Sequence, residues 1–218
     1  MPISRSIRDI AAAHPERPAI TTSNRSLTYR DLAHESPRII AAARQLHEGV
    51  RLTGRNASAA RPVTAVCTAS AFEAARIMAA LAGSEHIFAA IDPRWPVEHQ
   101  RNIVLAAGIG VVIVDDSESA ATLREALGEE CGEDWGGVIC TLTEFRNLEH
   151  PIDVATEVES DGPDISRPDS EPFLMLFSSG TTAAPKAFLK TRGQYRANLA
   201  VSKRHLSLIH ISEPTRLL

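Results

Sequence analysis

The hydrophobic pattern of the chain alternates between short apolar runs and longer stretches with a helical period. The short runs suit strands that are buried on both faces, because they are too short for independent helices. The longer stretches repeat apolar side chains at i, i+3, i+4 and i+7, which predicts amphipathic helices. The expected strands are 62–67, 87–91, 111–114, 138–140, 173–177 and 187–191, and the expected helices are 71–82, 97–107, 117–127 and 193–205.

This alternation of strands and helices predicts an α/β protein built from βαβ units. Strands joined by helices of ten or more residues form a parallel sheet that helices cover on its faces. The crossovers are expected to be right-handed. Ligands of such sheets bind at the carboxyl ends of the strands. We therefore look for binding chemistry immediately after a predicted strand.

The amino-terminal part of the chain has a different pattern. Residues 4–14 predict a short amphipathic helix, and residues 19–22 with 26–29 predict a hairpin. Thr28 is placed to cap a helix that starts at Tyr29, with Asp31 in its first turn. Pro37 either kinks this helix or moves its start to a later residue.

Composition and charge narrow the class of protein. A hydrophobic content of 44%, a charged content of 23% and a net charge of −4 are ordinary for a soluble protein. They give no reason to expect nucleic acid or an anionic membrane as a partner, and no apolar run approaches a membrane span. The first residues lack the apolar stretch of a signal peptide.

The cysteines and histidines give no metal pattern. Three scattered cysteines are too few for a disulfide framework or a zinc site, and they fit a reducing cytosol, so we expect a cytoplasmic protein. The pair His34 and Glu35 lacks the second histidine of an HExxH motif. The pair is therefore interpreted as a solvated helix position.

The chemically distinctive stretch follows the predicted strand from Phe173 to Phe177. A buried strand that opens into hydroxyls, a glycine and a lysine suggests a loop that binds phosphate. Gly180 lets the backbone approach a ligand closely, and Lys186 supplies a point charge suited to polyphosphate. Hydroxyls and successive amides that could form an anion-binding nest come from Ser178, Ser179, Thr181 and Thr182.

Two other interpretations of this loop were weighed. A Walker A loop requires a second glycine directly before the lysine and Ser or Thr directly after it, whereas Pro185 and Ala187 flank Lys186. A polar surface turn after a core strand is the simpler alternative, and it assigns the loop no ligand.

The residues Ser179, Gly180, Thr181, Thr182, Pro185 and Lys186 resemble a known signature. It belongs to the adenylate-forming superfamily, which includes acyl-CoA synthetases, luciferases and the adenylation domains of nonribosomal peptide synthetases. Their pattern is Ser-Gly-Thr-Thr-Gly-x-Pro-Lys-Gly. The chain departs from it at Ala183 and Ala187, where glycine is usual. If Ala183 must adopt a positive φ, its methyl group costs free energy.

Two further segments are similar to structural motifs of the same superfamily. One is Leu27 to Leu32, which we interpret as a packing motif without chemistry. The other is Gly83 to Pro96, whose Ile-Asp-Pro-x-aromatic-Pro form leans toward peptide-synthetase adenylation domains. Within it, Asp92 is expected to cap a turn and Trp95 to anchor packing.

The resemblance implies an activity for the parent protein. Such proteins are ATP-dependent ligases that join a carboxylic acid to AMP, release pyrophosphate, and pass the acyl group to a thiol. The implied partners are ATP with Mg²⁺, a carboxylic acid, and coenzyme A or a carrier-protein phosphopantetheine as the acceptor. The implied nucleotide-binding residues are Ser178, Ser179, Gly180, Thr181, Thr182 and Lys186. No catalytic residue and no Mg²⁺ ligand is expected in this chain.

The resemblance also sets the expected domain organisation. Residues 1–205 correspond to the first part of an AMP-binding amino-terminal domain, with a solvated acidic loop at 149–171. A catalytic carboxylate pair could lie in that loop, although nothing positions it. Residues 206–216 resemble a translated adaptor from sequencing libraries, so 206–218 is expected to be an artefactual tail. The alternative to a catalytic parent is a non-catalytic nucleotide-binding remnant or a non-functional truncated fragment.

Overall fold

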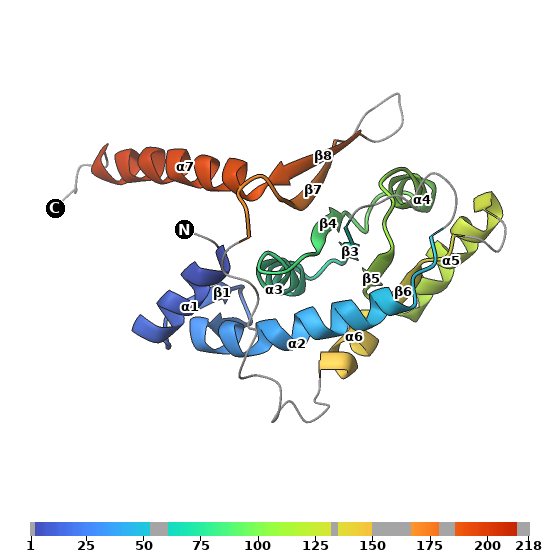
Figure 1. The fold of residues 1–218 in the computed structure, drawn as a ribbon, viewed down its shortest axis with the longest axis horizontal. Helices are drawn as coiled ribbons and strands as arrows, with labels where there is room; N and C mark the ends of the chain where they lie inside the picture. Colours follow the sequence, from blue (N-terminus) through green and yellow to red (C-terminus); the bar gives the residue numbers. More distant parts are fainter. Residues whose placement is uncertain (1–2, 53–60, 132–134, 150–166, 179–185, 213–218) are drawn as a thin grey trace.

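The computed structural model describes residues 3–52, 61–131, 135–149, 167–178 and 186–212. Its centre is a six-stranded sheet with the order β6-β5-β3-β4-β7-β8 (Figure 1), in which every neighbouring pair is parallel except β7 and β8. The predicted α/β class with a parallel sheet is therefore confirmed. The remaining two strands, β1 and β2, form a separate antiparallel hairpin.

Four of the parallel strands are short and apolar, as the pattern predicts. They are β3 (Val63–Cys67), β4 (Ile87–Ile91), β5 (Val111–Val114) and β6 (Val138–Thr141). Every residue of β3 and β5 is buried, because helices cover both faces of the sheet. The expected strands at 87–91 and 111–114 have the observed limits.

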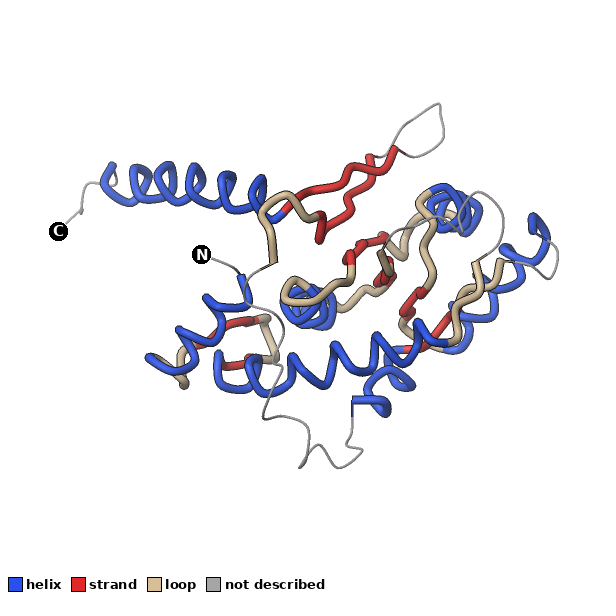
Figure 2. The backbone as a smooth tube through the Cα atoms, viewed as in Figure 1, coloured by secondary structure: helices blue, strands red, loops and turns tan. Residues whose placement is uncertain are grey.

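Helices cover the two faces of the sheet in separate groups (Figure 2). One core cluster joins the sheet to α2 (Tyr29–Glu48), α3 (Ala71–Leu81) and α6 (Leu142–Glu149). The other joins it to α4 (Val97–Ala106) and α5 (Ser117–Cys131). Trp95 packs in this second cluster, which supports its expected role as a packing anchor.

The amino-terminal elements follow the expected order. They are α1 (Ile3–Ala13), β1 (Pro18–Thr21) and β2 (Ser26–Thr28), which lead directly into α2. Thr28 and Asp31 form a capping box, in which the Thr28 hydroxyl accepts from the Asp31 amide at 3.2 Å. The predicted cap is therefore confirmed. Because α2 begins at Tyr29 and contains Pro37, the alternative of a later start is wrong.

One helix of the sheet layer was not expected from the apolar pattern. The chain forms α6 directly after β6, and this helix ends at Glu149, which was expected to begin the solvated loop. Thr141 and Glu144 form a second capping box at its start: the Thr141 amide donates to the Glu144 carboxylate at 2.8 Å, and the Glu144 amide donates to the Thr141 hydroxyl at 3.1 Å. The Thr-x-x-Glu spacing is a sequence signal for this helix that the apolar period does not carry.

The carboxyl-terminal part adds a hairpin to one side of the sheet and continues into a helix that leads away from it (Figure 1). The hairpin consists of β7 (Pro172–Ser178) and β8 (Lys186–Thr191), and α7 (Arg192–Ser212) follows at once. The expected boundary after residue 205 falls within α7 and stays a prediction. Among the described residues, no helix is long and apolar enough to cross a bilayer.

Candidate phosphate-binding site

The site is built on the hairpin of β7 and β8. In the antiparallel register of these strands, Ser178 lies opposite Lys186. Ser178 is the last residue of β7, and Lys186 is the first residue of β8 and is exposed. The pairing therefore holds the first and last residues of the predicted phosphate-binding segment side by side.

The position of β7 in the sheet follows from its apolar residues. Phe173, Leu174 and Met175 are 1%, 6% and 5% exposed, and the strand lies between β4 and β8. Because β7 runs parallel to β4, its carboxyl end lies at the same edge of the sheet as the carboxyl ends of β3 and β4. This is the edge at which sheets of this kind bind ligands.

The structure describes only part of the predicted binding set. Ser178 and Lys186 lie at the base of the segment, as stated above. The predicted residues Ser179, Gly180, Thr181 and Thr182 lie outside the described residues, as does Ala183. Of the two departures from the signature, Ala187 lies in β8, and no described residue other than glycine has a positive φ.

A turn beside this edge supplies a second polar feature. Asp92 accepts hydrogen bonds from the Arg94 amide at 2.9 Å and from its guanidinium at 2.9 and 2.6 Å, so it caps the turn as expected. These bonds lower the pKa of Asp92 to about 2. Thr68, Asp92 and Trp95 line a depression of about 470 Å³ at the carboxyl ends of β3 and β4.

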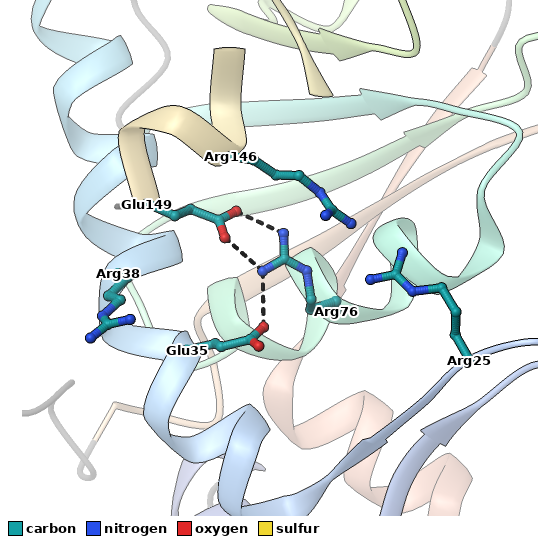
Figure 3. Close-up of a pocket in the computed structure, with 6 residues that line it drawn as sticks. All are labelled: Arg25, Glu35, Arg38, Arg76, Arg146 and Glu149. Carbon is teal, nitrogen blue, oxygen red and sulfur yellow. Dashed lines mark hydrogen bonds and ion pairs between the residues drawn. The ribbon is translucent and has the colours of Figure 1, made fainter. Parts of the chain in front are cut away.

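A cluster of arginines and glutamates on the α2, α3 and α6 side was missed by sequence reasoning (Figure 3). Arg76 of α3 is its centre, and its guanidinium donates to Glu149 at 2.7 and 2.7 Å, to Glu35 at 3.0 Å and to Glu73 at 3.0 Å. Arg25 donates to Glu73 at 2.8 Å, and Arg146 also contacts Glu73. The interpretation of Glu35 as a solvated position is wrong, because its side chain is 32% exposed and holds Arg76.

The arginines and glutamates of this cluster form ion pairs with one another. Burial alone would raise the pKa of Glu73, but Arg76 and Arg146 lower it below the usual value. Burial likewise opposes the charge of Arg76, and Glu149 raises the pKa of Arg76 above its usual value. Because each nitrogen of Arg76 already has a carboxylate partner, we interpret the cluster as a structural tie between helices rather than as a catalytic site. The depression that it lines measures about 190 Å³.

The other end of the expected solvated loop, at Glu171, is also held by ion pairs. Glu171 accepts from Arg61 at 2.9 Å and from Arg167 at 3.2 Å, and these arginines lower the pKa of Glu171 to about 2. Together with Glu149, it shows that the described ends of the expected solvated loop are held by ion pairs. Neither carboxylate is free to act as a catalytic acid.

The half-buried His47 and the buried His86 meet at the opposite edge of the sheet. His47 Nε2 lies 3.0 Å from the Thr64 hydroxyl, and the same hydroxyl lies 3.2 Å from His86 Nδ1. Burial lowers the pKa of each imidazole to about 4. The two rings are therefore neutral at pH 7. Their position at the amino ends of β3 and β4 keeps them away from the candidate site.

The described cysteines have no sign of reactivity or metal binding. Cys67 and Cys140 are free thiols and are buried, and burial raises the pKa of each to about 12. Within the described part of the chain, no group of three His, Cys, Asp or Glu side chains could hold a metal ion.

The fold defines a class: an α/β protein whose sheet is parallel except for the antiparallel pairing of β7 with β8. The sequence profile of the AMP-binding enzyme family matches residues 7–212. The match covers nearly the whole chain, and the chain therefore belongs to the AMP-binding enzyme family.

Solved structures with the same fold agree with this assignment. O-succinylbenzoate coenzyme A synthetase (MenE) from Bacillus subtilis, in complex with AMP, is 15% identical, with a TM-score of 0.65 over 90% of this chain and 44% of that one. A fatty acyl CoA synthetase from Mycobacterium tuberculosis is 16% identical, with a TM-score of 0.65 over 87% and 34%. VinN in complex with 3-methylaspartate is 18% identical, with a TM-score of 0.64 over 87% and 47%.

This chain is much shorter than the three solved structures. It spans less than half the length of the three structures, and it matches the amino-terminal part of adenylate-forming enzymes. At this level of identity the likeness shows the fold alone. No curated protein matches the chain in a sequence search.

Proposed function

We propose that the chain supplies the phosphate-binding part of an ATP-dependent ligase that activates a carboxylic acid as an acyl-adenylate. The observation that supports this proposal is the pairing of Ser178 with Lys186 at the carboxyl edge of the parallel strands. Membership of the AMP-binding enzyme family supports a nucleotide as the ligand, and we assign it to this edge. In the proposed reaction the acid attacks the α-phosphorus of ATP, pyrophosphate leaves, and the acyl-adenylate then passes its acyl group to a thiol.

The role of the hairpin in this reaction is electrostatic. The exposed ammonium of Lys186 faces solvent beside the segment that carries the predicted hydroxyls and amides. A fixed cation at this place offsets the charge that builds up on the departing pyrophosphate. ATP binds as its Mg²⁺ complex, and we assign the ion no ligand among the described residues. The acceptor is coenzyme A or a carrier-protein phosphopantetheine.

The test compares two lysines of the same strand. In a full-length version of the protein, Lys186→Ala is expected to slow ATP–pyrophosphate exchange about 100-fold, because it removes one preorganised charge from the transferring phosphates. Lys190→Ala is the matched control, since it removes an equal charge at the far end of β8. Equal exchange rates in the two variants would contradict the role of Lys186.

The second candidate is a nucleotide-binding remnant without catalysis. In the sequence, the alanines at 183 and 187 raise this alternative, because the signature has glycine at both positions. Since Ala187 lies in β8 without a positive φ, the alternative rests on Ala183 and on the share of the related structures that the chain spans. Calorimetry of the 218-residue chain with ATP and Mg²⁺ distinguishes this remnant, which binds nucleotide, from a chain that binds none. We expect weak or no binding, because the chain holds only part of the length over which its structural relatives extend.

A further inference from the structure

A polar cluster lies at the amino ends of β4 and β7, the edge of the sheet opposite the candidate phosphate-binding site. Because β7 runs parallel to β4, the residues that precede the two strands, Glu85 with His86 and Glu171, lie near one another. The antiparallel pairing of β8 with β7 brings Arg192, which directly follows β8, to the same place. The strand order therefore gathers charged side chains that are distant in the sequence.

Hydrogen bonds and ion pairs close a ring at this place. The Arg192 amide donates to the Glu171 carbonyl at 3.0 Å, and the Arg192 guanidinium donates through Nη2 to the Ser84 carbonyl at 2.7 Å. Arg167 donates to the Glu171 carboxylate at 3.2 Å, and its Nη2 lies 3.6 Å from the Glu85 carboxylate. Since Ser84 and Glu85 are consecutive, the ring is complete. The amino-edge cluster consists of Ser84–His86, Arg167, Glu171 and Arg192.

Three buried nitrogen atoms of the amino-edge cluster have no hydrogen-bond partner among the described residues. They are Nη1 of Arg192, Nε of Arg167 and Nε2 of His86. Arg192 and His86 are 5% and 1% exposed. A buried polar group without a partner is costly, and such groups commonly mark the place of an ordered water or an ion. This chain already covers the three atoms, so no further segment is needed to enclose them.

The charges at this edge do not balance. The two glutamates of the cluster contact Arg44, Arg61 and Arg167, and Arg192 adds a fourth guanidinium. Among the described residues, Arg192 has no carboxylate partner for its side chain, and its guanidinium donates only to a backbone carbonyl. Burial lowers the pKa of Arg192, and the nearby charge of Glu171 does not reverse this. A buried cation of this kind calls for a negative partner.

The His86 ring can supply a third donor to the same place. His47 Nε2 lies 3.0 Å from the Thr64 hydroxyl, and that hydroxyl lies 3.2 Å from His86 Nδ1. When the hydroxyl donates its one proton to His86 Nδ1, the neutral His86 ring carries its own proton on Nε2. A water molecule could accept from the three nitrogens, but only an anion also offsets the charge of Arg192.

We propose that the amino-edge cluster binds one small monovalent anion, of about the size of chloride, through Nη1 of Arg192, Nε of Arg167 and Nε2 of His86. The anion gives the three nitrogens a common acceptor and reduces the excess of positive charge. It must be small, because packed side chains already enclose these atoms. It ties the amino ends of β4 and β7 to the start of α7. The site lies at the edge opposite the proposed nucleotide site, and the inference does not depend on the proposed function.

A titration of the 218-residue chain with sodium chloride tests this site, with sodium gluconate added to keep the ionic strength constant. Chloride is expected to raise the thermal unfolding midpoint in proportion to ln(1 + [chloride]/Kd), because it binds the folded chain alone. Gluconate is too large for the enclosed site and is the reference. Broadening of the chlorine NMR line by the folded chain measures binding directly, and excess bromide is expected to reverse it.

Variants separate the site from a general effect of salt. Arg192→Gln is expected to raise the dissociation constant of chloride at least about tenfold, because it removes a charged donor. Arg167→Gln, at a side chain that is 22% exposed, is a second variant that should weaken binding in the same direction. Arg124→Gln removes an equal charge from an exposed position of α5 and is the matched control.

Two results would overturn the site. One is an unfolding midpoint that is the same in chloride and in gluconate, together with an unbroadened chlorine line. The other is a chloride affinity that is the same in Arg192→Gln, Arg167→Gln and Arg124→Gln. A saturable chloride effect that both cluster variants weaken and the control keeps would support it.

Discussion

Arg76 binds Glu149 through two hydrogen bonds of 2.7 Å, which tie α3 to the last residue of α6. The side chains are 5% and 12% exposed, so this pair is shielded from solvent.

Glu149→Gln leaves a buried guanidinium with one carboxylate fewer. We expect a loss of about 3 kcal/mol in the free energy of unfolding, measured by urea titration. Glu125→Gln, at an exposed position of α5, is the control and should change it little. Equal effects of the two substitutions would contradict the structural role of the pair.

The half-buried His47 and the buried His86 predict that stability falls in weak acid. Their pKa values are near 6.5 when unfolded and about 4 when folded, so the unfolded chain binds more protons between these values. The contribution of the neutral rings to the free energy of unfolding is therefore fully present above pH 6.5. It is lost as the pH falls toward 4. A shift of this size corresponds to about 3 kcal/mol of unfolding free energy for one histidine. The charged groups that act on the rings are Glu85 for both, and Arg44 and Arg167 for His86.

The measurement is the free energy of unfolding at several pH values between 7 and 4. His47→Gln is expected to reduce the slope in this window, because it removes one of the two groups that take up a proton. His34→Gln, which changes an exposed histidine of α2, should leave the slope as it is. A wild-type stability that is flat from pH 7 to pH 5 would show that the two rings are not buried as described.

The thiols predict a pattern of chemical labelling. The high pKa and the burial of Cys67 and Cys140 keep both as unreactive thiols in the native chain. In a Cys131→Ser variant, we expect neither to react with Ellman's reagent before denaturant is added and both to react afterwards. Fast labelling of the native variant would mean that one of the two core clusters is open to solvent.

The departure from the family signature at Ala187 is expected to be harmless. Ala187 lies in β8 opposite Phe177 and has no positive φ. Ala187→Gly should therefore cost about 0.5–1 kcal/mol of stability, because glycine gains conformational freedom in the unfolded chain. It should not raise ATP–pyrophosphate exchange in a full-length version. A faster exchange would show that the residue after the lysine needs the freedom of glycine.

The sheet could be predicted from the sequence because its strands are buried on both faces. A strand such as Val111–Val114 has to be apolar throughout, and the flanking polar residues then mark its limits. The strands β7 and β8 could be predicted in the same way, but their antiparallel pairing was not predicted. Thr28 and Asp31, three residues apart, indicated a start of α2 at Tyr29, and the structure confirms this start over the later one that Pro37 left open.

The ion-pair cluster could not be predicted, because its partners are distant in the sequence. Arg76 and Glu149 are 73 residues apart, and Glu73 by itself fits an ordinary first-turn carboxylate. Only the packing of α2, α3 and α6 on one face brings these charges together. The short helix α6 escaped notice for another reason: its capping box is a polar signal, and its eight residues are too few for a long apolar repeat.

The pairing of β4 with β7 has a kinetic consequence. The strands β3, β4 and β5 follow one another with a single helix between neighbours, whereas β7 reaches β4 only after the chain has passed through β5, α5, β6 and α6. Closing this long loop costs more chain entropy than closing a single βαβ unit. We therefore expect pulse-labelling hydrogen exchange during refolding to protect the amides of β3 and β4, which pair across a single helix, before those of β7.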